Sequence, residues 1–280
     1  MADTRPSISD KRRAFHALHA SGCFVIPNPW DVGSARYLQG LGFKALASTS
    51  AGMAWSQGRA DNAITLDTAL QHLTELVAAT DVPINADFEG GFAMEAAGVF
   101  ESVTLAMRTG VAGLSIEDST GNAAAPLFDL AQASERIRAA RRAIDQAGGD
   151  ALLVGRAECF LVGRPDIIET IARLQAYAQA GADCLYAPGL RTPEHIRAVV
   201  AAVAPKPVNL LYAWPDMSVA DIAALGVRRI SVGGAMARAA WGGLQRAAQL
   251  LATEGRFDGF AGAMPGAELN GFFRADAAQR

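Results

Sequence analysis

The stretch PINADFEGGFAMEAAGVFESVTLAMRTGVAGLSIE, residues 83–117, decides the fold. It begins with a short apolar run at 83–88 and ends with another at 113–117, and a longer segment with helical periodicity separates them. Two strands joined by a helix form a βαβ unit, in which the strands pair in parallel. Gly110, just before the second run, is typical of the residue that ends a helix.

The same alternation occurs eight times along the chain. Between the apolar runs, hydrophobic residues recur at helical spacing, as in Leu66, Leu70, Leu73 and Val77. Eight consecutive units favour a closed (β/α)8 barrel, or TIM barrel, over an open doubly wound sheet. We expect one domain over residues 1–280, with the barrel at about 22–252 and an extra C-terminal helical segment at 253–280. The expected strands lie at 23–27, 45–48, 83–88, 113–117, 152–158, 184–187, 208–212 and 229–232.

Charge and composition exclude several classes of protein. The 280 residues are 51% hydrophobic and carry a net charge of -3, with no basic stripe, so we expect no nucleic-acid partner. No apolar stretch reaches the ~18 residues that span a bilayer, and the N-terminus lacks a secretory signal. The three cysteines lie in or beside apolar runs, which is typical of reduced, buried thiols. We therefore expect a cytoplasmic protein that does not contact membranes.

Charged and amide side chains gather where the expected strands end. In this fold the chemistry lies at the carboxyl ends of the strands. Asn85, Asp87 and Glu89 share one side of the third strand by period-two alternation, Glu117 ends the fourth strand and Arg156 lies in the fifth. Carboxylate and amide oxygens are ligands that Mg2+ prefers. The pattern predicts a Mg2+ site, which Mn2+ could also fill, whereas the four histidines lie outside the strand ends and do not suggest zinc.

These residues make the sequence similar to the isocitrate lyase/phosphoenolpyruvate mutase superfamily. The resemblance extends from the PNPWD motif at 27–31 to the Gly233-Gly234 turn, and its motifs are specific only in combination. They are Thr49-Ser50-Ala51, Gly58-Arg59-Ala60-Asp61, Asn85-Ala86-Asp87 with Gly90-Gly91-Phe92, Ile116-Glu117-Asp118, Arg156 and Pro188-Gly189-Leu190.

The resemblance assigns roles to individual positions. It implies Mg2+ held directly by Asp87, with Glu117 acting through water. The strand pattern adds Asn85 and Glu89 as expected metal ligands. The resemblance implies catalytic roles for Asp61, Glu117 and Arg156. The small carboxylate substrate would be bound by Trp30, by the Thr49, Ser50 and Ala51 segment, and by Asn122, Arg156 and Asn209. The resemblance also implies a homotetramer, a dimer of dimers, whose last helix swaps between subunits.

Two positions depart from the superfamily pattern. Asn85 stands where the superfamily has an acidic residue, and Glu89 is the nearest carboxylate that could compensate. Residues 121–128 read GNAAAPLF and contain neither the cysteine nor the histidine of the lyases' Lys-Lys/Arg-Cys-Gly-His loop. Lyase chemistry that uses that cysteine as its acid or base is therefore not expected.

The remaining features predict a Mg2+-dependent enzyme that cleaves a C–C bond in a small 2-oxo or 2-hydroxy acid through a metal-stabilised enolate. Oxaloacetate decarboxylation needs no proton removed before the bond breaks, whereas retro-aldol cleavage of a methylisocitrate or dimethylmalate needs a base. Two alternatives stay open. One is a P–C bond mutase or hydrolase of the phosphoenolpyruvate mutase type, and the other is a non-catalytic protein that binds 2-oxo acids.

Overall fold

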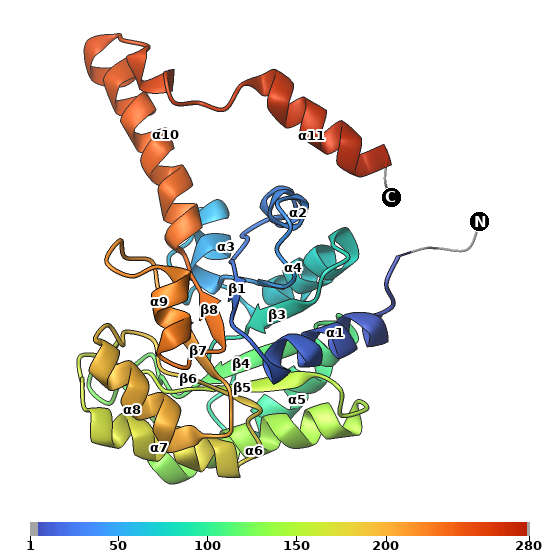
Figure 1. Ribbon diagram of the computed structural model, residues 1–280, viewed down its shortest axis with the longest axis vertical. Coiled ribbons are helices and arrows are strands. Elements are labelled where there is room, and N and C mark those ends of the chain that lie inside the picture. Colours follow the sequence, from blue (N-terminus) through green and yellow to red (C-terminus); the bar gives the residue numbers. More distant parts are fainter. Residues whose placement is uncertain (1–4, 279–280) are drawn as a thin grey trace.

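The computed structural model describes residues 5–278, and its centre is a barrel of eight parallel strands (Figure 1). Hydrogen-bonded neighbours follow the order β1-β8-β7-β6-β5-β4-β3-β2. The backbone N–H of Ala47 donates to the carbonyl of Pro27 at 3.0 Å, so the two terminal strands approach each other and nearly close the barrel. The strands are β1 (Phe24–Ile26), β2 (Leu46–Ala47), β3 (Ile84–Asp87), β4 (Gly113–Glu117), β5 (Leu152–Arg156), β6 (Cys184–Tyr186), β7 (Val208–Leu211) and β8 (Arg229–Ser231).

Helices connect the strands and surround them. The first, α1, precedes β1, and two helices, α3 and α4, lie between β2 and β3. The helices are α1 (Ile8–Ala20), α2 (Val32–Gly40), α3 (Ser50–Ser56), α4 (Leu66–Ala79), α5 (Ala96–Arg108), α6 (Leu130–Gln146), α7 (Ile167–Gln179), α8 (Pro193–Val203), α9 (Val219–Ala224), α10 (Ala235–Glu254) and α11 (Gly266–Ala278), with a short 3-10 turn, η1 (Asp258–Phe260), before the last.

The (β/α)8 barrel expected from the sequence is confirmed. Each of the eight expected strands contains one observed strand, and the observed strands are equal in length or shorter. The fifth strand differs most at its carboxyl end, because it ends at Arg156 rather than at residue 158. The excess residues at the carboxyl ends belong to the loops that carry the site, whereas those at residues 23, 45 and 83 precede their strands.

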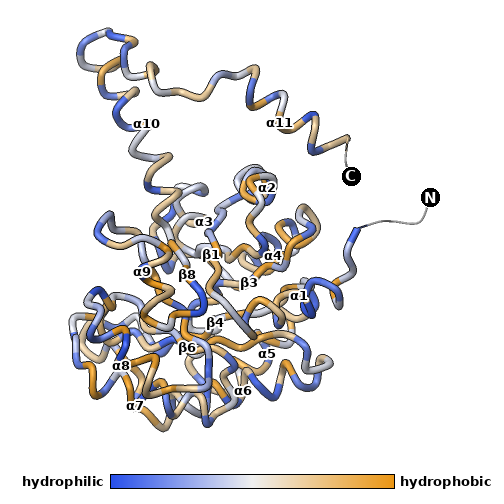
Figure 2. The backbone as a smooth tube through the Cα atoms, in the orientation of Figure 1, coloured by the Kyte–Doolittle hydropathy of each residue, from blue (hydrophilic) through white to orange (hydrophobic). Residues whose placement is uncertain are grey.

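The hydrophobic core lies between the strands and the inner faces of the helices, where Figure 2 shows hydrophobic segments alternating with hydrophilic ones. Leu76 of α4, Val103 of α5 and Leu174 of α7 are fully buried in this cluster. A second cluster places Phe15 of α1 against Ile26 and other residues of the strands. Because a Cβ on Gly113 would lie 2.9 Å from the Phe15 ring, α1 packs tightly against the start of β4. In residues 5–278 no helix combines the length and apolarity needed to cross a bilayer.

The last two helices extend beyond the barrel. Figure 1 shows α10 running away from the strands and α11 returning toward α2. Phe272 of α11 fits against Gly40 of α2, where an added Cβ would lie 2.4 Å from the ring, and Arg36 pairs with Asp276. Among the described residues of α11 none is fully buried. The helical C-terminal segment is therefore present, and it rests on α2 of the same chain.

Candidate active site

A small cavity opens among the residues at and beyond the carboxyl ends of the strands. Its volume is about 160 Å³. Backbone and side chains from the loops after β1, β2 and β8 form one wall, and the strand residues Asp87, Arg156 and Tyr186 form another. The further lining residues include Asn28, Ser48, Thr49, Ser50, Ala51, Asp61, Asn85, Gly233 and Gly234. This cavity, the strand-end cavity, is the candidate active site.

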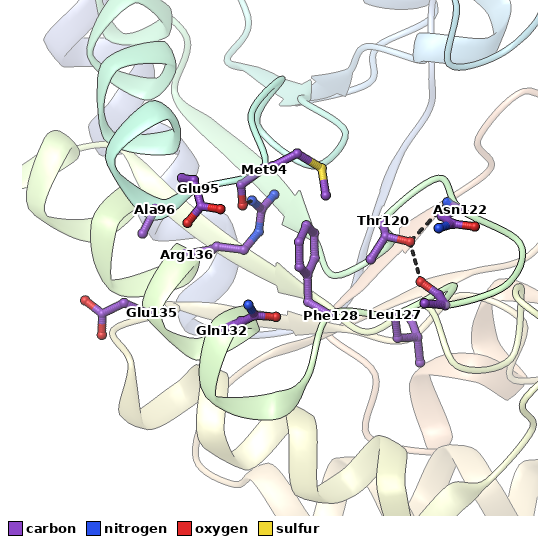
Figure 3. Close-up of a pocket in the computed structure, with 11 residues that line it drawn as sticks. Met94, Glu95, Ala96, Thr120, Asn122, Leu127, Phe128, Gln132, Glu135 and Arg136 are labelled. Carbon is purple, nitrogen blue, oxygen red and sulfur yellow. Dashed lines mark hydrogen bonds between the residues drawn. The ribbon is translucent and has the colours of Figure 1, made fainter.

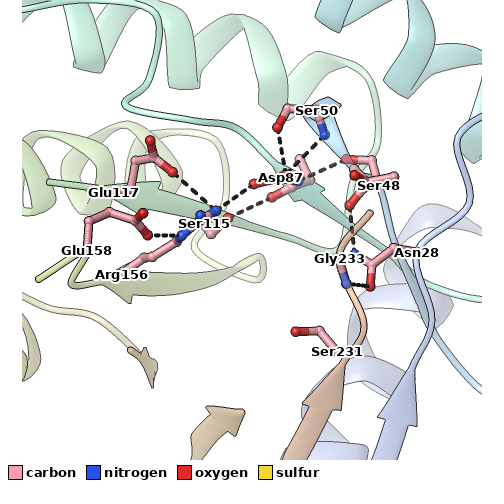
Figure 4. Close-up of polar contacts among 12 residues, drawn as sticks. Asn28, Ser48, Ser50, Asp87, Ser115, Glu117, Arg156, Glu158, Ser231 and Gly233 are labelled. Atoms are coloured by element: carbon pink, nitrogen blue, oxygen red, sulfur yellow. Dashed lines mark hydrogen bonds and ion pairs between the residues drawn. The ribbon is translucent and has the colours of Figure 1, made fainter. Parts of the chain in front are cut away.

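Arg156 occupies the centre of a carboxylate cluster (Figure 4). Its Nη1 lies 3.1 Å from Asp87 Oδ1 and 3.1 Å from Glu117 Oε2, and its Nε donates to Glu158 Oε1. The strand register explains one of these pairs, because Glu117 and Arg156 are direct partners across β4 and β5. Three carboxylates therefore converge on one guanidinium, whose side chain is 16% exposed.

The second oxygen of Asp87 is held by the start of α3. Asp87 Oδ2 accepts hydrogen bonds from the backbone N–H of Ser50 at 3.0 Å and from its hydroxyl at 2.9 Å. Thr49 is the N-cap of this helix and accepts from the N–H of Gly52 at 3.2 Å. Because the first N–H groups of a helix have no partner inside it, they favour an anion. The segment to which the superfamily resemblance assigns substrate binding thus faces an anion in the structure, namely Asp87.

Negative charge exceeds positive charge in this cluster. Burial raises the pKa of Glu117 and of Glu158, and the nearby Arg156 only partly opposes this effect. Burial, together with the charge of Asp87, raises the pKa of Glu89 to about 7 and shifts the pKa of Asp61 upward as well. The raised pKa values mean that the single positive charge of Arg156 does not fully offset the burial of these carboxylates. The cluster would gain from one more cation.

The donor set fits Mg2+. Asp87, Glu117 and Glu89 offer carboxylate oxygens, and Glu89 Oε1 is buried without a hydrogen-bond partner among the residues described. Within residues 5–278, no three or more His, Cys, Asp or Glu side chains form a ready-made cage. Mg2+ does not need such a cage, because it keeps waters and substrate oxygens alongside one or two carboxylates. Asp87 with Glu117 and Glu89 are the residues that would hold it.

Asn85 and Asn209 lie deeper in the barrel, around Arg229. Asn85 Oδ1 accepts from Arg229 Nη1 at 3.3 Å, and Asn209 Oδ1 accepts from Arg229 Nε at 2.8 Å. The three side chains are at most 2% exposed. Asn85 still lines the strand-end cavity, whereas Asn209 is not among its lining residues. Both amide oxygens are thus already engaged, and the metal and substrate roles expected for them stay predictions.

Four other expected site residues, Glu89, Glu117, Asn122 and Trp30, are not among the lining residues of the strand-end cavity. Glu89 lines a neighbouring cavity of about 410 Å³ that also includes Glu117. Asn122 is exposed, and its Oδ1 accepts from the N–H of Ala124 at 3.0 Å within its own loop. Trp30 lines an apolar cavity beside α2, α10 and α11. Substrate binding by Asn122 and Trp30 also stays a prediction.

A buried ion pair between Asp118 and Arg173 supports the site, and the sequence pattern did not predict it. Asp118 follows Glu117, and its Oδ2 accepts from Arg173 at 3.0 Å and from the Tyr177 hydroxyl at 2.5 Å. Its Oδ1 accepts from the backbone N–H of Glu158 at 2.8 Å. Arg173 and Tyr177 come from α7, so this network fixes the ends of β4 and β5 to a helix. The i, i+4 spacing of Arg173 and Tyr177 was the only sequence signal for it.

The fold and the site define a class of protein: a (β/α)8 barrel with an arginine–carboxylate cluster at the carboxyl ends of its strands. The sequence profile described as phosphoenolpyruvate phosphomutase matches residues 15–252. The chain belongs to this family, which is part of the phosphoenolpyruvate mutase/isocitrate lyase superfamily.

Individual relatives extend this result. The chain is 31% identical over 233 residues to an oxaloacetate decarboxylase of Chromohalobacter salexigens, covering 80% of this chain and 79% of that protein. A putative lyase/mutase from Burkholderia cenocepacia J2315 has 46% identity and a TM-score of 0.93, covering 95% and 97% of the two chains. The structure of oxaloacetate acetylhydrolase with its product oxalate has 26% identity and a TM-score of 0.85, covering 98% and 97%.

Proposed function

We propose that this protein is a Mg2+-dependent lyase that breaks a C–C bond one carbon away from the 2-oxo group of a small carboxylic acid, as in the C3–C4 bond of oxaloacetate, which is the first candidate. The observation that carries the proposal is the position of Arg156, between Asp87 and Glu117 at 3.1 Å each, on the wall of a cavity of about 160 Å³. A site of this size suits a compact acid. The relatives named for oxaloacetate chemistry support the same substrate class.

The residues of the chain account for binding and orientation. The guanidinium of Arg156 is a fixed donor for the carboxylate or the 2-oxo oxygen, and residues 49–51 at the start of α3 line the same cavity. Mg2+ bound at Asp87 would supply positive charge where the 2-oxo oxygen gains electron density. In oxaloacetate the C3–C4 bond then breaks, its electron pair moves toward C2 and its oxygen, CO2 leaves, and C3 takes up a proton to give pyruvate.

The loop at 121–128 favours decarboxylation over retro-aldol cleavage. It contains no cysteine or histidine, and it is closed by its own hydrogen bonds, including Thr120 N–H to Pro126 O at 3.0 Å. Retro-aldol cleavage of a 2-hydroxy acid requires a base to take the hydroxyl proton. Decarboxylation of a 2-oxo acid does not, so a site of this composition suits it better.

An assay for pyruvate release tests the proposal. Purified protein is incubated with oxaloacetate, methylisocitrate and substituted malates, with Mg2+ or with EDTA, and pyruvate is followed with a coupled dehydrogenase. Mg2+-dependent pyruvate release above the spontaneous decay of oxaloacetate is expected. Proton NMR of the same mixtures separates decarboxylation from hydrolysis, which yields oxalate and acetate instead. No turnover of any of these acids with Mg2+ present would contradict the proposal.

P–C bond chemistry is the second candidate, because Asp61 lies at the same cavity and burial raises its pKa. The superfamily resemblance matches Asp61 to the residue used in phosphoryl transfer. Phosphorus-31 NMR with phosphonopyruvate separates the two functions, since only P–C chemistry moves the phosphorus signal. If calorimetry instead shows 2-oxo acid binding without turnover at high protein concentration, the chain is a binding protein.

We also propose a homotetramer, a dimer of dimers, in which α11 crosses to a neighbouring subunit. Support comes from side chains that a single chain leaves exposed on α10 and after it, where Trp241 is 47%, Leu244 57% and Phe257 69% exposed. Apolar surface of this kind is typical of subunit interfaces. Cytoplasmic location remains our expectation.

A further inference from the structure

We propose that Arg136 of α6 is a positioning residue that holds the loop after β3, residues 89–94, in the conformation the reaction requires. This inference rests on the proposed function for its activity measurement, but the loop itself provides an independent measurement. Arg136 does not line the strand-end cavity, and nothing in the sequence pattern distinguishes it from the other arginines of its helix.

Arg136 is buried, and its guanidinium donates to the loop at several points. The residue is 2% exposed. Nη1 donates to the carbonyl oxygens of Ala93 at 2.6 Å and Met94 at 2.5 Å, and Nη2 donates to the carbonyl oxygen of Gly90. Figure 3 shows the side chain extending from α6 toward Met94 and Glu95. A buried cation whose two Nη groups donate to three backbone carbonyls fixes the shape of that backbone.

The loop needs such support because its backbone is unusual. Glu89 and Phe92 adopt φ angles of 48° and 54°, in the left-handed region that residues with a side chain seldom occupy. Residues persist in this region only when their surroundings impose it. The three carbonyl groups held by Arg136 lie between and just after these two residues, so the guanidinium acts where the strain is located.

The loop carries groups of the site. The backbone carbonyl of Glu89 accepts from the N–H of Glu117 at 3.0 Å, and a Cβ on Gly90 would lie 3.2 Å from Arg136 Nη2. The side chains of Glu89 and Glu117 line one cavity together with Arg136. A change in the loop would therefore move Glu89 relative to Glu117 and Asp87, on which the proposed reaction depends.

Arg136 also connects this loop to the next one. Its Cζ lies 4.0 Å from the centre of the Phe128 ring, at the end of the loop that follows β4. The backbone of Phe128 is also fixed, because its carbonyl accepts from the Arg173 guanidinium at 2.9 Å and its N–H donates to the backbone carbonyl of Asp118 at 3.0 Å. One guanidinium thus joins the two loops that border the cavity of Glu89 and Glu117, with Phe128 as the anchored partner.

The test compares Arg136→Ala with Arg138→Ala. Arg138 lies on the same helix, but its side chain is 49% exposed and forms an ion pair with Glu135, which is also exposed. Both changes remove one guanidinium from α6 and introduce the same residue, so they affect helix propensity similarly. Hydrogen exchange of the 89–94 amides, kcat and KM for the acid that the wild type turns over, and thermal unfolding are measured for all three proteins.

We expect faster exchange at 89–94 in Arg136→Ala alone, with a loss in kcat on the order of 10- to 100-fold. Millimolar guanidinium, compared with the same concentration of NaCl, should restore part of both the exchange protection and kcat, which a general loss of folding would not allow. If Arg136→Ala does not fold, Arg136→Lys replaces it and should show an intermediate loss.

Unchanged exchange at 89–94 would overturn the inference, as would unchanged kcat, or a loss equal to that of Arg138→Ala. If the wild type turns over none of the acids, the proposed function fails, while the exchange measurement with and without guanidinium still decides whether Arg136 holds the loop.

Discussion

The phenolic oxygen of Tyr177 lies 2.5 Å from Asp118 Oδ2, in a buried contact that links α7 to the end of β4. Asp118 is 2% exposed, and its other oxygen holds the N–H of Glu158. Burial, followed by the charge of Asp118, raises the pKa of Tyr177, so the phenol stays a donor. The residue next to Glu117 is therefore an anchor for the strand that presents Arg156, rather than a further acid in the cavity.

Asp118→Asn should destabilise the fold, because it leaves the buried cation Arg173 with only Glu169 as a counter-charge. Removing one partner of a buried pair costs about 3 kcal/mol or more of unfolding free energy. Urea unfolding measures the change. Asp129→Asn is the control, since Asp129 is an exposed N-cap and asparagine caps equally well. Equal stability of the two variants would show that the Asp118 network contributes little.

Asp87→Asn should remove most of the Mg2+-dependent activity while the barrel stays folded. The amide keeps the size of the side chain but loses the charge that would bind the metal and that now pairs with Arg156. We expect kcat/KM to fall by about 10²–10³-fold, typical for loss of a charge at a reacting centre. Titration of turnover with Mg2+ measures the loss of activity, and circular dichroism checks that the barrel stays folded. Asp67→Asn, at an exposed position in the first turn of α4, is the control. Wild-type turnover in Asp87→Asn would contradict the assignment of Asp87 as a metal ligand.

Glu89 should make the metal-free protein less stable as pH rises. Its pKa is raised from 4.5 to about 7 by burial and by the charge of Asp87. The folded state therefore binds more protons than the unfolded state between these values. The contribution of Glu89 is greatest below pH 4.5 and is lost as pH rises through 7, by about 1–2 kcal/mol after allowance for solvent screening.

Glu89→Gln provides the comparison, because glutamine does not titrate. Urea unfolding in EDTA at pH 5 and pH 8 should show a smaller loss of stability for this variant than for the wild type. Parallel pH profiles would mean that Glu89 is more hydrated than the structure indicates.

The barrel could be predicted because its signal is local. Buried parallel strands appear as apolar runs, and each of the eight expected runs contains an observed strand. The rule that site residues follow strand ends also placed Asp87, Glu117 and Arg156 near one another, as their 3.1 Å contacts show. These residues lie on strands, where register decides which side chains meet.

Loop residues were harder to place because their direction depends on distant contacts. Period-two alternation puts Glu89 beside Asp87, but β3 ends at Asp87 and Glu89 has a φ of 48°, so the alternation stops there. Asn122 is turned into its own loop by the N–H of Ala124. The burial of Arg136 and Arg229 could not be predicted from the sequence. The carbonyl and amide groups that accept their hydrogen bonds lie 20 to 144 residues away along the chain.

Gly40→Ala should weaken the assembly that we propose for this chain. An added Cβ would lie 2.4 Å from the Phe272 ring, so the ring has to shift and its packing on α2 is disturbed. If α11 holds subunits together by docking on an α2 helix, the variant should dissociate at concentrations where the wild type stays assembled, and sedimentation velocity measures this. Gly33→Ala is the matched control, because it adds the same methyl group to α2 with the nearest atoms at 3.6 Å or more. Both changes replace a helical glycine by alanine and lower the conformational entropy of the unfolded chain to a similar extent. A difference between the two variants in the mass of the assembly therefore reports on the α11 contact alone. Equal masses at every concentration would show that the packing of α11 on α2 is unrelated to assembly.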